Sequence, residues 1–369
     1  MRKAIAAKLP TAVFLFLFPV LARTLPPAAR NYASGDLRSE HDVHTNSRGA
    51  IGVFCALRGD GACVVQQVTK GGPAESAGLR PGDVLLRLDP ADQATMVEQL
   101  AKHAIGTQVT IPFERHGERK QAVVTVGDQL SIALRGAELG DASAENTLGD
   151  IYLDGLGVEK DYAEALKWYQ QAAAKQFPAA EVRLGAMYEN GVGVPKNMNA
   201  ALNLYFQAAG QGSALGEWVI GNAYFNGIGV PKDQEAAFAW YTVAAKQNNP
   251  DAQAQIGYMY LNGYGVAKDP SAALDWYRKA ADQGELAAYF GLGDMYANGV
   301  GVPNDHATAA EWYRKAADKG YAAAEYSLGM MYATGDGVPQ DAKTAKDWLN
   351  KADKDGDSRA KQALEKMER

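Results

Sequence analysis

Residues 292–317 read "LGDMYANGVGVPNDHATAAEWYRKAA", and this stretch decides the fold of most of the chain. Its second half carries apolar residues at the spacing of one helical face: Ala309, Trp312, Tyr313, Ala316 and Ala317. Asp305 precedes that face and is of a residue type that caps helix N-termini. Further upstream, one stripe of another helix comprises Ala288, Leu292 and Tyr296. The stretch therefore predicts two helices joined by the turn "GVGV" at 299–302.

The same pattern returns every 36 residues. The glycine of the first helix recurs at Gly149, Gly185, Gly221, Gly257, Gly293 and Gly329. The residue that caps the second helix recurs at Asp161, Asn197, Asp233, Asp269, Asp305 and Asp341. Six copies fill residues 141–356 without insertion, which predicts an all-α solenoid of six helix-turn-helix repeats. We expect capping helices at 128–140 and at 357–369, where Glu365 and Glu368 replace the repeated glycine and tyrosine.

At the end of each second helix, the sequence predicts a residue in the left-handed backbone conformation. Glycine stands at this position in four repeats: Gly212, Gly284, Gly320 and Gly356. Asn248 is a natural substitute because asparagine tolerates that conformation, whereas Gln176 is not.

The repeats resemble Sel-one-like repeats, which are relatives of the tetratricopeptide repeats. The resemblance rests on the motif "LGxMYxxGxGVxxD…A…WYxKAA", which is nearly complete in the fourth and fifth copies. Leu204 and Leu349 depart mildly from it, in place of tryptophan and tyrosine. The resemblance implies a right-handed superhelix whose surface binds other proteins.

The first 22 residues have the features of a secretory signal peptide. Arg2, Lys3 and Lys8 precede an apolar core at 9–21 that is short for a membrane span, and Ala22 suits cleavage. An uncleaved anchor is the alternative. Residues 23–47 are Pro-rich and polar and predict a flexible tether. We therefore expect an exported protein, periplasmic or alternatively secreted, with no membrane span once the signal peptide is removed.

The net charge bears on the kind of partner, and the cysteines bear on a disulfide bond. The formal charge is −6 and the basic residues form no runs, which argues against a nucleic-acid partner. Cys55 and Cys63 are candidates for one disulfide across a hairpin with "RGDG" at its tip. The alternative is two small apolar residues packed in strands.

Residues 48–127 predict a compact α+β module of five or six strands and two helices. Two stretches resemble PDZ domains of the bacterial serine-protease-associated (HtrA-like) type: "RGAIGVF" at 48–54 and "GPAESAGLRPGDVLLRLD" at 72–89. The resemblance implies a small β-barrel or sandwich with two helices. It also implies that the module holds the C-terminal tail of a partner by strand addition.

Carried over residue by residue, the PDZ resemblance names a site. The carboxylate-binding loop would comprise Arg48, Ala50, Ile51, Gly52 and Val53. The peptide groove would be lined by Phe54 and Cys55 of the edge strand and by Met96, Val97 and Leu100 of a helix.

No stretch of the sequence predicts catalysis. The chain has five histidines, scattered over the tether, the PDZ-like module and one repeat turn, and no G-x-S-x-G motif. Ser358 and Lys361 form an isolated S-x-x-K, and the six G-x-G turns are better explained as helix-to-helix turns than as phosphate loops. We expect no enzyme activity, no cofactor and no metal site.

These patterns favour a non-catalytic adaptor of the cell envelope. The PDZ-like groove would bind a partner's C-terminus, and the solenoid would dock a second protein. The alternative is an accessory or regulatory subunit of an envelope protease or a cell-wall enzyme.

Overall fold

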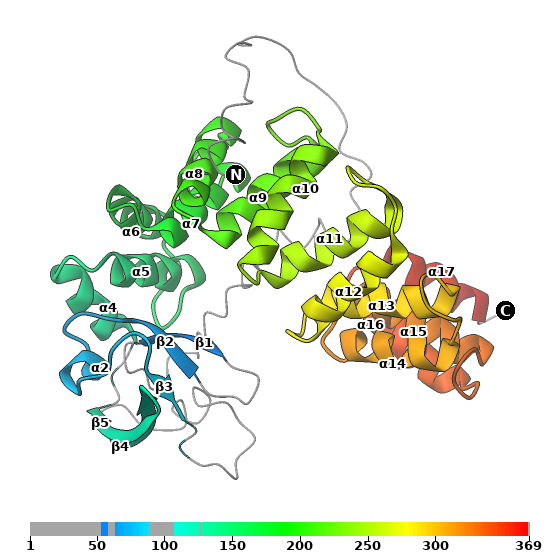
Figure 1. Ribbon diagram of the computed structural model, residues 1–369, viewed down its shortest axis with the longest axis horizontal. Coiled ribbons are helices and arrows are strands. Elements are labelled where there is room, and N and C mark those ends of the chain that lie inside the picture. Colours follow the sequence, from blue (N-terminus) through cyan, green and yellow to red (C-terminus); the bar gives the residue numbers. More distant parts are fainter. Residues whose placement is uncertain are drawn as a thin grey trace. The chain divides into compact units, whose positions relative to one another are not determined.

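The computed structural model describes residues 53–57, 63–86, 88, 107–125, 127 and 129–367, with backbone only for 54–57. A small antiparallel sheet comes first along the chain, and a series of helices follows it (Figure 1). The predicted order of an α+β module and then an all-α solenoid is confirmed. The predicted helix at 94–104 lies outside the described residues.

The sheet has five strands in the order β1-β2-β3-β4-β5. Their bounds are Val53–Leu57 (β1), Cys63–Val68 (β2), Val84–Leu85 (β3), Gln108–Arg115 (β4) and Glu118–Thr125 (β5). Every neighbouring pair is antiparallel. β4 and β5 form a hairpin in which Arg115 pairs with Glu118, and the two-residue turn between them has positive φ at both His116 and Gly117. That geometry matches the right-handed twist of the strands.

The run "GPAESAGLRPGD" forms a short helix and two turns. Helix α2 spans Pro73–Ser76 and begins at a proline, which is pre-set for a first helical turn. Gly78 and Gly82 both have positive φ, as their places in the turns require. The core between sheet and helix comprises Cys63, Val65, Ala74, Leu79, Leu85, Val109, Ile111, Phe113, Ala122 and Val124.

The solenoid is made of helix pairs, one pair for each repeat. The pairs are Ala142–Asp154 (α5) with Tyr162–Ala174 (α6), Pro178–Asn190 (α7) with Met198–Gly210 (α8), Ala214–Asn226 (α9) with Gln234–Lys246 (α10), Pro250–Asn262 (α11) with Pro270–Ala281 (α12), Leu286–Asn298 (α13) with His306–Ala317 (α14), and Ala322–Thr334 (α15) with Ala342–Lys354 (α16). Helices α4 (Gln129–Glu138) and α17 (Ser358–Met367) flank them. Each second helix also packs on the first helix of the next repeat. None of the helices in the described part of the chain is long and apolar enough to cross a membrane.

The six predicted capping residues open the second helices. Each side chain accepts a hydrogen bond from a backbone N–H of the first helical turn. The backbone N–H of each cap is itself occupied, because it donates to the carbonyl of the repeated tyrosine of the first helix, as Asp305 does to Tyr296. For this reason the reciprocal capping box that the spacing of Asp161 and Glu164 suggests does not form; Glu164 pairs with Lys167 instead.

Both glycines of every G-x-G-V turn have positive φ. The first glycine ends the first helix in the left-handed conformation. In the second to sixth repeats, the second glycine lies against the start of the preceding repeat's second helix. The left-handed position that ends the second helix is kept in all repeats, including Asn248 (φ 67°) and Gln176 (φ 58°). Gln176 therefore adopts a conformation that its side chain disfavours.

A glycine-to-aromatic contact joins the two helices of each repeat. A Cβ atom built on Gly221 would lie 2.6 Å from ring atoms of Tyr241, and one built on Gly257 would lie 2.9 Å from the ring of Tyr277. The same contact recurs in the other repeats, with Leu349 in place of the ring in the sixth. Only a residue without a side chain allows this approach, so the repeated glycine sets the distance between the two helices.

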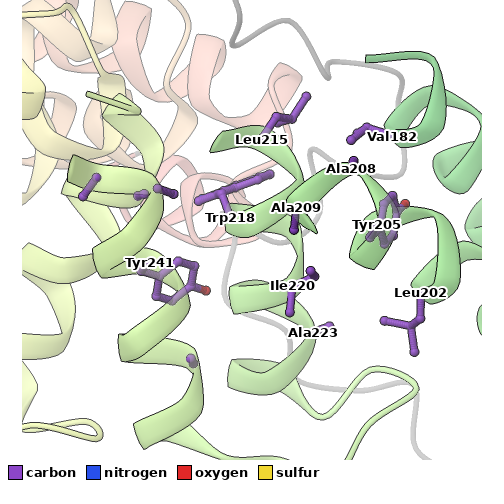
Figure 2. Packing of buried hydrophobic residues seen from close by; sticks show 14 of the residues in the cluster. Val182, Leu202, Tyr205, Ala208, Ala209, Leu215, Trp218, Ile220, Ala223 and Tyr241 are labelled. Carbon is purple, nitrogen blue, oxygen red and sulfur yellow. The ribbon is translucent and has the colours of Figure 1, made fainter. Parts of the chain in front are cut away.

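Apolar clusters extend across the borders between neighbouring repeats. One cluster runs from Val182 on α7 to Met259 on α11, and Figure 2 shows Tyr205, Ile220 and Tyr241 of three successive helices within it. The repeated second-helix tyrosines are fully or almost fully buried: Tyr169, Tyr205, Tyr241, Tyr277 and Tyr313. Each repeat thus depends on its neighbours to cover its apolar faces.

Helix α4 is buried on two faces rather than on one stripe. The helical spacing of Leu130, Ala133, Leu134 and Ala137 in the sequence predicts a single apolar stripe; Ala133 is buried toward α5, but Leu134 is exposed. Ile132 and Gly136 are buried instead, because Ile132 contacts Gly127 and Gly136 contacts Thr69, both of the PDZ-like module. Ser358–Met367 forms the predicted C-terminal helix.

We expect Gly221→Ala to lower the free energy of unfolding by about 1–3 kcal/mol, because the new methyl group overlaps the Tyr241 ring. Chemical denaturation of the chain from residue 23 onward measures this. Gly210→Ala is the matched control, since a Cβ atom at Gly210 meets nothing within 4 Å and alanine favours the helix by about 0.5–1 kcal/mol. Equal effects of the two substitutions would contradict the proposed role of the contact.

Gln176→Gly should raise the free energy of unfolding by about 0.5–1 kcal/mol, because it removes a left-handed glutamine. The reverse change at the equivalent position, Gly212→Gln, should lower it by a similar amount. Thermal unfolding of both variants checks this, and a loss of stability in Gln176→Gly would show that the Gln176 side chain stabilises the turn.

Candidate protein-binding surfaces

Strand β1 lies at one edge of the sheet. Among the described strands it pairs with β2 alone, from Val53 opposite Val68 to Leu57 opposite Cys63. A bulge interrupts the register between Phe54 and Cys55. An edge strand offers backbone N–H and C=O groups to an added strand, which is the way that PDZ domains bind peptides.

The described residues include only part of the site predicted from the sequence. Val53 is half-buried and packs on the sheet core, and the backbone of Phe54 and Cys55 belongs to β1. The remaining predicted residues lie outside the described part of the chain: Arg48, Ala50, Ile51, Gly52, Met96, Val97 and Leu100. Their roles stay predictions from the sequence.

Cys63 is disulfide-bonded and fully buried in the sheet core. The chain has one other cysteine, Cys55, whose side chain is outside the described residues. Cys55 lies two residues before Leu57, the strand partner of Cys63. The pairing of Cys55 with Cys63 stays a prediction.

An ion pair between the buried Asp83 and the half-buried Arg115 holds the turn that precedes β3. The Arg115 Nε and Nη2 groups each donate to an Asp83 carboxylate oxygen at 2.7 Å, and Nη2 also donates to the Gly78 carbonyl. Burial alone would raise the pKa of Asp83, but the hydrogen bonds from Arg115 and from the Arg80 backbone outweigh it, so that the pKa is lowered. Sequence reasoning missed Arg115, because its partner is 32 residues away. The two bonds from one guanidinium make the "RPGD" turn rigid.

The PDZ-like module contacts the start of the solenoid directly. The Lys70 backbone N–H donates to Asp141 Oδ2 at 2.9 Å, while Asp141 Oδ1 accepts from Ser143 N–H and so caps α5. An open depression of about 400 Å³ borders this contact, and its lining includes Pro73, Val123 and Arg135. One carboxylate therefore joins the sheet module to the first repeat.

Several of the buried tyrosines of the second helices are hydrogen-bonded to polar residues of the first helices. The hydroxyl groups of Tyr169, Tyr241 and Tyr313 donate at 2.6 Å to Asp150, Asn222 and Asp294, respectively. These three acceptors occupy the same position of the repeat, one residue after the glycine. Burial and the nearby carboxylate raise the pKa of Tyr169 well above its usual range. The tyrosines are therefore neutral donors that stabilise the helix pair.

The repeated tryptophans are half-buried, unlike the repeated tyrosines. The fixed spacing of the tryptophans and tyrosines in the sequence predicts that both are core residues, which is wrong for the tryptophans. Lys279, Lys315 and Lys351 lie 4.3, 3.8 and 3.9 Å from the ring centroids of Trp276, Trp312 and Trp348. Each lysine covers the ring three residues before it on the same helix. The indoles are thus shielded from water by intrachain contacts.

A carboxyl pair in the sixth repeat joins a buried glutamate to an exposed aspartate. Glu325 is 2% exposed and lies beside Asp355. The equivalent positions of other repeats also face each other. Glutamine or lysine stands at the Asp355 position in other repeats, for example Gln211 facing Glu181 and Lys175 facing Glu145. Burial, the negative charge of Asp355 and a hydrogen bond to it together raise the pKa of Glu325 from 4.5 to about 7. This pair therefore takes up a proton near neutral pH.

The described residues contain no group of three or more His, Cys, Asp or Glu side chains placed to hold a metal ion. Ser358 and Lys361 are both exposed on α17. Such an open position does not activate a serine, and a nucleophile of the S-x-x-K type needs a buried, flanked site.

The Glu325 pair predicts a pH dependence of stability. The folded state binds the proton of Glu325 more tightly than the unfolded chain does. The stabilisation of the fold by this proton is therefore complete below about pH 4.5 and is lost as the pH rises through about 7. Glu325→Gln should raise the melting temperature at pH 8 by about 2–4 °C relative to the natural chain. The gain should shrink toward pH 5.

Thermal melts between pH 5 and pH 8 measure this difference. Glu365→Gln is the control, because Glu365 is exposed on the last helix and should change the melting temperature little at either pH. A gain for Glu325→Gln that is the same at both pH values would contradict the assignment.

The chain matches two protein-family profiles. The profile described as PDZ domain matches residues 49–126, and the profile described as Sel1 repeat matches six consecutive segments: 142–177, 178–213, 214–249, 250–285, 286–321 and 322–357. A search of curated proteins returned no match.

A solved structure gives the same assignment for the repeats. A Sel1 repeat protein from Oxalobacter formigenes is 32% identical, with a TM-score of 0.55, over 61% of this chain and 96% of that protein. The protective antigen c5321 of uropathogenic Escherichia coli strains, described as displaying an SLR fold, is 34% identical over 64% of this chain and 58% of the antigen, with a TM-score of 0.45. The Sel1 matches cover more than half of the 369 residues. The chain therefore belongs to the Sel1 repeat family and carries a PDZ domain before its six repeats.

Proposed function

We propose that the protein is a non-catalytic adaptor of the cell envelope. Its PDZ domain captures the C-terminus of one partner, and its solenoid docks a second protein. Sel1 repeats and PDZ domains are protein-interaction modules, and this chain joins one of each kind.

The position of β1 is the observation that carries the PDZ half of the proposal. β1 is the last strand of the sheet, and the stretch "RGAIGVF" leads directly into it. A peptide that adds to the edge of β1 would therefore bring its terminal carboxylate to that loop. Backbone N–H groups of a glycine-containing loop bind such an anion.

The repeated contacts support the solenoid half. The glycine, tyrosine and capping residues that set the backbone are nearly the same in all six repeats, but the residue after the repeated glycine varies: Asp150, Ala186, Asn222, Tyr258, Asp294 and Met330. A constant scaffold with varied side chains suits recognition of a particular protein.

The export signal at 1–22 supports the envelope location, as does the disulfide at Cys63, since disulfides persist in oxidising compartments. The periplasm is the compartment that we propose. Cell fractionation of a tagged chain tests this part separately from binding.

A pair of peptides tests the carboxylate capture. Random peptide display on the chain from residue 23 onward selects C-terminal binders, and each binder is then made with a free and with an amidated C-terminus. We expect amidation to weaken binding at least about tenfold, because it removes the charge that the loop holds. Equal affinity for both forms would overturn the proposed capture.

Two matched substitutions locate the site. Ile51→Asp should abolish binding without loss of the fold, because we place Ile51 at the groove. Val123→Asp should leave binding unchanged, since Val123 is 56% exposed on β5, the opposite edge of the sheet. Unfolding of the Ile51→Asp chain would show that Ile51 is a core residue instead.

A further inference from the structure

Asp150 and Asp294 hold the same position in the first and fifth repeats, 144 residues apart. Each accepts a hydrogen bond of 2.6 Å from the buried tyrosine of its own repeat, Tyr169 or Tyr313. The internal repetition makes Asp150 a template for Asp294, since the surrounding backbone is the same in both. Differences between the two sites come from the side chains.

At Asp150 the carboxylate is surrounded by donors from this chain. Arg183 of the next repeat places its Nε 3.3 Å from Asp150 Oδ1, and Asn146 Nδ2 donates to Oδ2 at 3.3 Å. The side chains of Arg183 and Asp150 are only 15% and 5% exposed. Arg183 therefore supplies the positive charge at this site, and little of the site is exposed to solvent.

At Asp294 both of these donors are replaced. The position of Arg183 is occupied by Ser327, and the position of Asn146 is occupied by Phe290. Asp294, Ser327 and Phe290 are all half-buried, so the site is open to solvent. The hydrogen bond that the structure gives to this carboxylate comes from Tyr313.

Aromatic rings lie near the Asp294 carboxylate. The Phe290 ring lies 5.6 Å from that of Tyr313 and 5.5 Å from that of Tyr321, measured between centroids. Burial and the charge of Asp294 raise the pKa values of Tyr277 and Tyr321. The pKa of Tyr321 reaches about 12, and Glu285 also contributes to this shift. A carboxylate bordered by aromatic rings attracts a flat cation both by charge and by the ring faces.

The described cation whose charge acts on Asp294 already has a partner. The positive charge of Arg359 acts on Asp294, but the Arg359 guanidinium is bonded to Asp357 through Nε and Nη2 and lies 4.2 Å from the Tyr326 ring centroid. Burial raises the pKa of Asp294, and the Tyr313 hydrogen bond and Arg359 oppose this without cancelling it. Glu285 also acts on Tyr321, although burial and the charge of Asp251 raise the pKa of Glu285 to about 7 and Lys319 opposes this. A half-buried carboxylate whose pKa is raised by burial is stabilised in its charged form by an added cation.

We propose that Asp294, Phe290 and Ser327 form a binding site for an arginine side chain of a partner protein, in the position that Arg183 fills beside Asp150. The guanidinium pairs with the carboxylate and stacks on the Phe290 ring, and the small Ser327 side chain leaves room for it. Arginine suits this site better than lysine, because its planar group both forks onto a carboxylate and stacks. The inference rests on the proposed role of the solenoid as a protein-docking surface and names the chemistry of that partner.

Peptides with blocked ends test this site apart from the PDZ groove. An array of acetylated and amidated nonapeptides, each with a central arginine and varied flanks, is probed with the chain from residue 23 onward. The best binders are remade with citrulline, which keeps the shape of arginine and removes its charge. We expect citrulline to weaken binding about tenfold or more, as measured by fluorescence anisotropy.

Asp294→Asn and the arginine-to-citrulline change form a double-mutant cycle, and two further variants accompany it. Asp294→Asn should weaken the arginine peptides about tenfold and make arginine and citrulline peptides nearly equal. Ser327→Arg should weaken them as well, because it places a guanidinium of the chain itself at the site. Asp336→Asn is the charge-matched control and should change nothing, since Asp336 lies in the turn of the sixth repeat, paired with His306 at 3.0 Å.

Two results would overturn the proposal. One is an array with no arginine peptide bound to the natural chain; the other is an arginine-to-citrulline ratio that Asp294→Asn leaves unchanged. Neither result touches the PDZ half of the proposed function, because that half is measured with free-carboxylate peptides. Retained melting temperature in Asp294→Asn confirms that lost binding is not lost folding.

Discussion

The close approach of a glycine to an aromatic ring, repeated along the chain, is the constraint on which this structure depends. At Gly221 and its equivalents, any side chain would overlap the ring of the second helix, so the two helices of a repeat have one available spacing. The ring in turn uses its hydroxyl group to bind the first helix, as Tyr241 does at Asn222. The turn between the helices follows from the same need, because a short connection with two left-handed glycines brings the second helix back over the first. Stacking of such pairs then buries the faces that one pair alone leaves exposed.

A uniform backbone separates the residues that fold the chain from those that can recognise a partner. The capping residues and the repeated glycines determine the fold. The positions between them are free to differ, and the contrast between Asp150 and Asp294 shows how far: one carboxylate is closed by Arg183, and the other has Ser327 in that place. At the N-terminal end, Asp141 both caps α5 and accepts from Lys70 of the PDZ domain. Two interaction modules are therefore joined by a specific contact as well as by the chain.

Most of the fold could be predicted from the sequence, because the signals that determine it are local or periodic. Asp305 caps a helix through its own side chain, and turn geometry requires the left-handed glycines. Both features could therefore be predicted from the local sequence. What could not be predicted depends on tertiary contacts: the Arg115–Asp83 pair, the exposure of Leu134 on a helix buried on two other faces, and the shared carboxyl environment of Glu325. The left-handed Gln176 shows the repeat context overriding a residue's own preference. For the PDZ site, the structure gives the edge position of β1, while the loop residues that would hold a carboxylate rest on sequence resemblance alone.

The central functional claim is that a partner's C-terminus adds to the edge of β1. Amide hydrogen exchange of the chain, followed by mass spectrometry with and without a selected free-carboxylate peptide, tests it directly. An added strand bonds to backbone N–H groups, so the account predicts slower exchange in the segment 50–57 and little change in β5 at the other edge of the sheet. Protection confined to the solenoid helices, with residues 50–57 unchanged, would contradict the account and move peptide binding to the repeats.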